Sequence, residues 1–145
     1  NYYWEQTNPP FTSKRAPAER IAAIRRDLEN EDSWVLSGSM CNWGEPLFKE
    51  FTLVVFLRLN GSLRIRRIQE RERQRYGRRI EAGGDMHEQH LQFLEWAGSY
   101  DTAEPPVRSL ALHQHWLETL SCQVIELNSE LTVPDLLREV GAHLR

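Results

Sequence analysis

Residues 52–79 read TLVVFLRLNGSLRIRRIQERERQRYGRR, an apolar run followed by an arginine-rich run. The apolar run, residues 52–57, predicts a β-strand, and because it is continuous we expect both faces of that strand to be buried. A strand buried on both faces needs helices above and below it. The sequence therefore predicts an α/β fold, a three-layer αβα sandwich around a parallel sheet.

The arginine-rich run concentrates positive charge in a weakly acidic chain. From Arg58 to Arg79 there are nine of the eighteen basic residues and only two acids, whereas the whole chain has a net charge of −3. All nine are arginines, whose planar guanidinium matches phosphate or carboxylate oxygens with two parallel donors. This pattern indicates a phosphorylated ligand. A solvent-facing helix surface is the alternative, and composition alone does not separate the two.

Hydrophobic periodicity predicts that helices alternate with strands along the rest of the chain. Residues 1–16 read as a loop with an aromatic anchor, because the prolines of Asn8-Pro9-Pro10 exclude a helix. The alternation calls for a parallel sheet with right-handed crossovers. The predicted helices are 17–30, 60–76, 83–98, 108–120 and 132–143, and the further predicted strands are 33–37 and 122–127.

Five residues are expected to fix helix ends. Ser62 is the candidate cap of the arginine-rich helix, which Gly77 would end. Asp85 and Glu88 have the spacing of a capping box, with aspartate in the role of the usual serine or threonine. Thr132 would cap the last helix.

Length and composition predict a single domain over residues 1–145. No window approaches the roughly eighteen apolar residues of a membrane span, and the first residues lack the apolar core of a signal peptide. Cys41 and Cys122 have no CxxC spacing, so we expect free thiols in a cytoplasmic protein. His87 and His90 predict no metal site, because an i,i+3 pair without a nearby cysteine is not diagnostic.

Six stretches carry a resemblance that extends over nearly the whole chain. They are YYW with NPPFTSKR, SWVLSGSMCNWGEPL, VVFL, RIRRIQERERQRYG, GGDMHEQH and VIELNSELTVPDLLREV. Together they resemble the adenylate-kinase-like branch of the P-loop kinases, especially its small bacterial members described as AAA-type ATPases or putative kinases. The resemblance implies a P-loop NTPase-like fold in which residues 60–106 form a helical, arginine-rich lid.

The resemblance has one large gap. The family begins with a strand, a GxxxxGK[ST] or related phosphate loop, a helix and a second strand, and this sequence contains no such pattern. The resemblance implies that this N-terminal β-α-β part, with its Walker A loop, precedes Asn1. In the family the first strand lies between the strands expected here at 33–37 and 52–57, so without it buried backbone groups would lack partners. We therefore expect the isolated chain to fold poorly and to be inactive.

For the nucleotide, the resemblance implies that arginines at the base of the lid clamp the phosphates of ATP. Phosphoryl transfer depends mainly on positioning and charge neutralisation, which suits these arginines and an accompanying Mg²⁺. Asn128 and Ser129 would pack on the adenine. The residues implied in transfer are Arg67, Arg71, Arg75 and Arg78, with Arg79 as a lid partner; Arg71 and Arg75 would also bind ATP.

For the acceptor, the resemblance implies an aromatic wall, a short turn and one acid across the lid. The turn lies where related kinases often place an acid and a glycine, and here Ser37 replaces the acid. The aromatic residues alone favour a hydrophobic plug over the core at least as well as a wall for a ring-shaped ligand. The implied acceptor residues are Tyr3, Trp4, Trp43, Ser37, Gly38, Ser39 and Asp85.

The resulting hypothesis is ATP-dependent phosphoryl transfer to an unidentified small-molecule or nucleotide acceptor. A non-catalytic fragment or pseudo-kinase that binds a partner is the first alternative. A nucleic-acid-binding module is the second, and the net charge of −3 and the absence of aromatics between the arginines, apart from Tyr76, count against it. The sequence predicts no membrane partner and leaves a homodimer open.

Overall fold

The computed structural model describes residues 1–144. Contacts within the chain group into two compact units, residues 1–50 and the residues from Phe51 onward. The single domain expected from the length stays a prediction. Among the described residues, no helix is long and apolar enough to cross a membrane.

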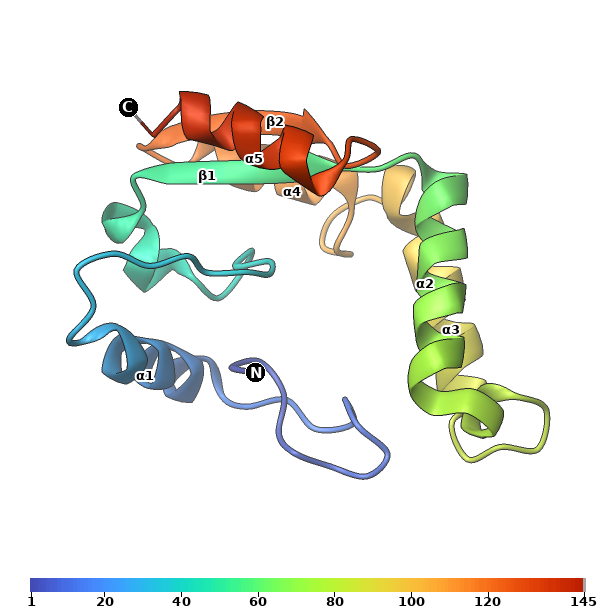
Figure 1. Cartoon of the computed structure of the whole chain (residues 1–145). Helices are drawn as coiled ribbons and strands as arrows, with labels where there is room; N and C mark the ends of the chain where they lie inside the picture. Colours follow the sequence, from blue (N-terminus) through green and yellow to red (C-terminus); the bar gives the residue numbers. More distant parts are fainter. Residues whose placement is uncertain (145) are drawn as a thin grey trace. The chain divides into compact units, whose positions relative to one another are not determined.

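The second unit contains a sheet of two parallel strands, β1 (Leu53–Arg58) and β2 (Gln123–Asn128), which lie side by side in Figure 1. The register runs from Leu53 opposite Gln123 to Arg58 opposite Asn128, so the carboxyl ends of both strands lie together. The mixed α/β class and the parallel pairing expected from the sequence are confirmed.

Successive residues of a strand point to opposite faces of the sheet. Helical segments contact this strand pair on both faces. On one face the Phe56 ring packs against His113 of α4 (Leu110–Glu118), with 5.9 Å between the ring centroids. On the other face the Gln123 side-chain nitrogen lies 3.0 Å from Nδ1 of His143, the residue that ends α5 (Val133–Ala142). Residues 53–56 are only half-buried, so the expected burial of both faces of β1 is realised in part.

The arginine-rich helix is α2 (Gly61–Tyr76), which follows β1 directly and packs along α3 (His87–Gly98) (Figure 1). Its cap is Asn60, whose Oδ1 accepts a hydrogen bond from the Ser62 amide over 3.0 Å, so Ser62 is the bonded residue and not the cap. Gly77 ends α2 with φ +52°, a left-handed conformation that glycine tolerates best, as predicted.

Between α2 and α3 lies a short 3₁₀ turn, η2 (Gly77–Ile80), followed by a tight loop. The predicted capping box at Asp85 is wrong, because the cap position of α3 is Met86. The carboxylate of Asp85 instead binds Arg79, over 2.7 Å. At the start of α5 the prediction is confirmed, since the Thr132 hydroxyl accepts from the Asp135 amide over 3.3 Å.

The first unit packs α1 (Pro17–Leu28) against the short 3₁₀ helix η1 (Glu45–Glu50) and the turn before it. Ile24 of α1 and Leu47 of η1 are almost fully buried, at 0% and 1% exposure. The aromatic N-terminal segment folds back on itself, with Trp4 in an isolated antiparallel bridge to Lys14. The start of α1 at Pro17 agrees with the sequence prediction.

The predicted strand at 33–37 is wrong: this segment has no regular structure, and Val35 in its middle is 97% exposed. An apolar run becomes a strand only when a neighbouring strand satisfies its backbone groups. No strand among residues 1–144 pairs with this segment. Its apolar composition therefore predicted a local propensity and not the structure.

Candidate functional site

Five of the nine arginines between Arg58 and Arg79 pair with a carboxylate of the described residues. Arg64 is the best anchored, with Nη2 at 2.7 Å from Asp101 Oδ2 and its guanidinium over the Tyr100 ring. Each of these pairs neutralises one of the positive charges. The pairs are Arg58–Glu126, Arg64–Asp101, Arg73–Glu70 and Arg79–Asp85, with a longer contact of 3.7 Å between Arg71 and Glu72.

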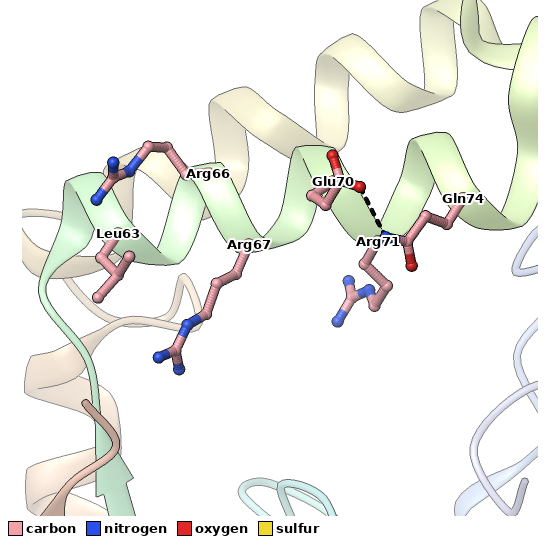
Figure 2. A pocket seen from close by; sticks show the side chains of 6 residues that line it. All are labelled: Leu63, Arg66, Arg67, Glu70, Arg71 and Gln74. Atoms are coloured by element: carbon pink, nitrogen blue, oxygen red, sulfur yellow. Dashed lines mark hydrogen bonds between the residues drawn. The ribbon is translucent and has the colours of Figure 1, made fainter. Parts of the chain in front are cut away.

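Two arginines without a carboxylate partner among residues 1–144, Arg66 and Arg67, lie on one face of α2 together with Arg71. An open hollow of about 420 Å³ lies along that face, and positions three and four apart on a helix line it. Figure 2 shows Arg67 and Arg71 extending from the same side of α2. The hollow is lined by Leu63, Arg66, Arg67, Glu70, Arg71 and Gln74, so three cations face one acid.

Within the hollow, the only acid is held by its neighbours. The Glu70 carboxylate accepts a hydrogen bond of 2.7 Å from the Gln74 side chain, drawn as the dashed line in Figure 2. It also forms an ion pair with Arg73, whose Nη1 lies 3.3 Å from a Glu70 carboxylate oxygen. No carboxylate of the described residues pairs with Arg66 or Arg67. These two residues therefore carry positive charge that no carboxylate within 1–144 neutralises.

Arg67 connects the hollow to the loop that follows β2. Its Nη1 donates to the carbonyl oxygen of Ser129 over 2.9 Å. The Ser129 amide in turn donates to the Arg58 carbonyl oxygen at the end of β1, over 2.7 Å. Two separately predicted groups, the lid-base arginines and the loop 128–129, thus meet at the carboxyl end of the parallel strands. In open parallel sheets this edge is where ligands bind.

The other residues predicted to bind the nucleotide, Asn128, Arg75 and Arg78, do not line the hollow. Asn128 uses its Oδ1 to accept from the Glu130 amide over 2.9 Å, which shapes the loop. Arg75 and Arg78 are exposed, do not line the hollow, and make no side-chain bond to any residue within 1–144. The geometry therefore groups Arg67, Arg71 and Ser129, but not Arg75 or Arg78.

Asp85, predicted to face the acceptor, forms an ion pair with Arg79 in the connection between α2 and α3. Arg79 binds it through two nitrogens, with Nη2 at 2.7 Å and Nε at 2.9 Å from the carboxylate oxygens. The hydrogen bond from Arg79 lowers the pKa of Asp85, and the same contact raises the pKa of Arg79. This pair gives both residues a structural role at the turn, at a site separate from the hollow.

The predicted acceptor wall lies in the first unit. Tyr3 contacts Trp4 and Trp43 edge to face, with centroid separations of 5.1 Å and 6.0 Å. The Trp43 indole donates to the Ser39 carbonyl oxygen over 2.9 Å, which fixes the turn that carries it. The structure thus brings Tyr3, Trp4, Ser39 and Trp43 together.

Ser37 and Gly38 do not join that aromatic group. Both are exposed, and Gly38 has φ +122°, a conformation that other residues rarely adopt. The backbone conformation alone therefore explains why this position is a glycine. Their predicted role toward the acceptor stays a prediction.

Sequence reasoning missed two buried charged residues. Arg20 of α1 is only 5% exposed, although charged residues between the apolar positions of a helix usually face solvent. Glu72 of α2 is 8% exposed and lies 3.9 Å from Nδ1 of His90 on α3. A charge run gives no sign of which of its members will be buried. Among residues 1–144, no group of three or more His, Cys, Asp or Glu side chains could hold a metal ion.

Comparison with known proteins identifies a relative. The chain is 44% identical over 144 residues to a protein described as uncharacterized protein YqaC of Bacillus subtilis (strain 168), and the match covers 99% of this chain and 79% of that relative. No protein-family model matches the chain. No solved structure matches it either. Identity and coverage of this extent show that the chain belongs to the same family as YqaC of Bacillus subtilis.

Proposed function

We propose that the hollow on α2 binds the phosphate groups of ATP, and that the protein transfers a phosphoryl group to a small-molecule or nucleotide acceptor. The observation that carries the proposal is the set of arginines on one face of α2, connected by Arg67 to the loop after β2. The hollow is lined by three guanidinium groups and one carboxylate, and that carboxylate already bonds to Gln74 and Arg73. The excess positive charge suits a ligand with several negative charges. A triphosphate is the common small ligand with that charge and reach.

The position of the hollow supports the same proposal. β1 runs directly into α2, and the residue after β2 accepts the bond from Arg67. Ligands of doubly wound α/β proteins sit at the carboxyl ends of the strands. We therefore include in the proposal a P-loop NTPase-like sandwich, of which the parallel strand pair with α4 and α5 would be a part.

In this proposal each residue has a role that its geometry suits. Arg71, anchored only by the 3.7 Å contact to Glu72, would pair with the terminal phosphate and neutralise charge that develops during transfer. Arg66 would neutralise the remaining phosphates. Arg67 would orient the loop at Ser129, which would contact the nucleoside. Mg²⁺ would arrive with the triphosphate, and no ligand for it is assigned within this chain.

The decisive experiment measures ATP binding and transfer of the γ-phosphate with the full-length natural protein and with matched variants of it. Arg71→Ala should lose ATP affinity and turnover, whereas Arg73→Ala should not, because Arg73 pairs with Glu70. Equal ATP affinity in both variants and the wild type would remove the hollow from the proposal. ATP binding that depends on Arg71 but occurs without transfer to any acceptor would favour the non-catalytic alternative.

A further inference from the structure

The first unit contains a buried arginine, Arg20, that pairs with no carboxylate among residues 1–144. Arg20 is 5% exposed, and its Nε has no hydrogen-bond partner. No ion pair or side-chain hydrogen bond joins Arg20 to another residue within 1–144. Burying a charge without an opposite charge is costly, and folded proteins almost always compensate for it.

The compensation that is present comes from two aromatic rings. The Arg20 guanidinium carbon lies 3.8 Å from the centroid of the Tyr3 ring and 5.5 Å from that of Trp43. Stacking on Tyr3 occupies the face of the planar guanidinium and leaves the N–H groups at its edge free to donate. Nε is sealed from solvent, whereas neither Nη atom of Arg20 is among the buried side-chain atoms that lack a partner.

Other unpaired polar groups belong to the same short region. The Oγ1 of Thr7 and the Nε of Arg15 are also buried without a partner. The Arg15 amide donates to the carbonyl oxygen of Tyr3 over 3.0 Å, so the two arginines adjoin the same tyrosine by different atoms. Among residues 1–144, the carboxylate that pairs with Arg15 is Glu5, at 3.9 Å. Positive charge in this region therefore exceeds what its own acids neutralise.

We propose that Arg20 anchors a binding site for a small oxyanion, the phosphate or carboxylate group of a ligand that lies beside Tyr3 and Trp43. The edge of the guanidinium binds two oxygens of the anion in parallel, while the tyrosine ring holds the guanidinium in place. The site belongs to the first unit alone and does not depend on ATP binding at α2. It would give the aromatic cluster a ligand-binding role in addition to packing.

The test uses inorganic phosphate, sulfate and acetate as probes, at constant ionic strength, with the full chain. The chain has five tryptophans, so NMR can follow each indole N–H, including that of Trp43 which donates to Ser39. We expect a saturable shift of the Trp43 signal. Phosphate and sulfate acting without acetate would indicate a phosphate-type ligand, and acetate acting equally well would indicate a carboxylate.

The decisive variant is Arg20→Lys, which keeps the charge but loses the paired donors. It should weaken anion binding at least about tenfold, because lysine does not replace a stacked, bidentate arginine. Arg26→Lys is the matched control, since Arg26 lies on the same helix with its side chain 73% exposed. Equal anion affinity in Arg20→Lys and the wild type, or a shift that does not saturate, would overturn the proposal.

Two measurements separate this site from the hollow on α2. Arg67→Ala should leave the response of Trp43 to phosphate unchanged. Arg20→Lys should leave ATP affinity at the hollow unchanged. If ATP does not bind but the Trp43 signal still responds through Arg20, the oxyanion site stands and the proposed function fails; the reverse pattern overturns the oxyanion site alone.

Discussion

Arg67 and Ser129 are joined by a hydrogen bond in which Nη1 of the arginine donates to the serine carbonyl oxygen over 2.9 Å. The bond connects the middle of α2 to the first residue after β2, although 62 positions separate the two in sequence. Because the Ser129 amide also bonds to the end of β1, three elements meet at this point. Any ligand at the carboxyl edge of the strands would contact this junction.

Arg67→Ala should loosen that junction. The loop after β2 loses its charge-assisted bond to α2, so the amides of residues 129–131 should exchange with solvent faster. We also expect ATP affinity to fall by about tenfold, or about 1.4 kcal/mol. Hydrogen exchange and calorimetric titration measure the two effects. Arg66→Ala is the matched control for the loop, because Arg66 lines the same hollow without bonding to Ser129.

A loss of ATP affinity in both of these variants, with faster loop exchange only in Arg67→Ala, would support the assigned roles. Unchanged exchange at Ser129 in Arg67→Ala would mean that the bond contributes nothing to the order of the loop.

Arg71→Ala should lower the turnover of phosphoryl transfer by more than about an order of magnitude, because a positioned cation stabilises charge in the transition state. The alanine variant of Arg73 should keep its turnover, since that arginine already pairs with Glu70 over 3.3 Å. Steady-state kinetics with a labelled γ-phosphate measure both. Turnover in Arg71→Ala equal to that of the wild type would remove Arg71 from the site.

Asp85→Asn tests whether the acid at the hairpin tip serves the acceptor or the fold. The Arg79 hydrogen bond lowers the pKa of Asp85, so the contact stabilises the folded state above the ordinary pKa of 3.8 and is lost as pH falls through the lowered value. Since both side chains are exposed, we expect only a small drop in the thermal midpoint at neutral pH and unchanged kinetics. A large loss of acceptor affinity would instead assign Asp85 to the acceptor site.

The sequence predicted those elements whose cause is local. Continuous apolar residues predicted β1, the proline at position 17 predicted the start of α1, and Gly77 and Thr132 predicted a helix end and a helix cap. Each of these depends on the conformational preference of one residue or on a short periodic pattern.

Features set by distant neighbours were not predicted. The apolar segment around Val35 lacks the paired strand that its composition suggested, and Asp85 binds Arg79 instead of capping α3. The bond from Arg67 to Ser129 follows from the register of β1 with β2, which no local pattern specifies. The burial of Arg20 has the same origin, because Tyr3 and Trp43 cover it from other segments.

His113 should make the second unit sensitive to acid. It packs on Phe56 of β1, and its Nδ1 lies 2.7 Å from the Tyr100 hydroxyl. Burial, with a smaller contribution from Arg108, lowers the pKa of His113 below its ordinary value of 6.5. The folded state therefore favours the neutral ring: this contribution to stability is complete above pH 6.5 and is lost as pH falls through the lowered pKa.

We expect the free energy of unfolding to decrease between about pH 7 and about pH 5, with part of that decrease due to His113. Denaturant titrations at several pH values measure it. His113→Gln cannot titrate, so its stability should vary less with pH, even if it is lower throughout because the packing on Phe56 changes. His115→Gln is the control, since His115 lies on the same helix with its side chain 78% exposed. Parallel pH profiles for wild type and His113→Gln would show that His113 is not the group that titrates, because removing a half-buried histidine with a lowered pKa must flatten the profile in this range.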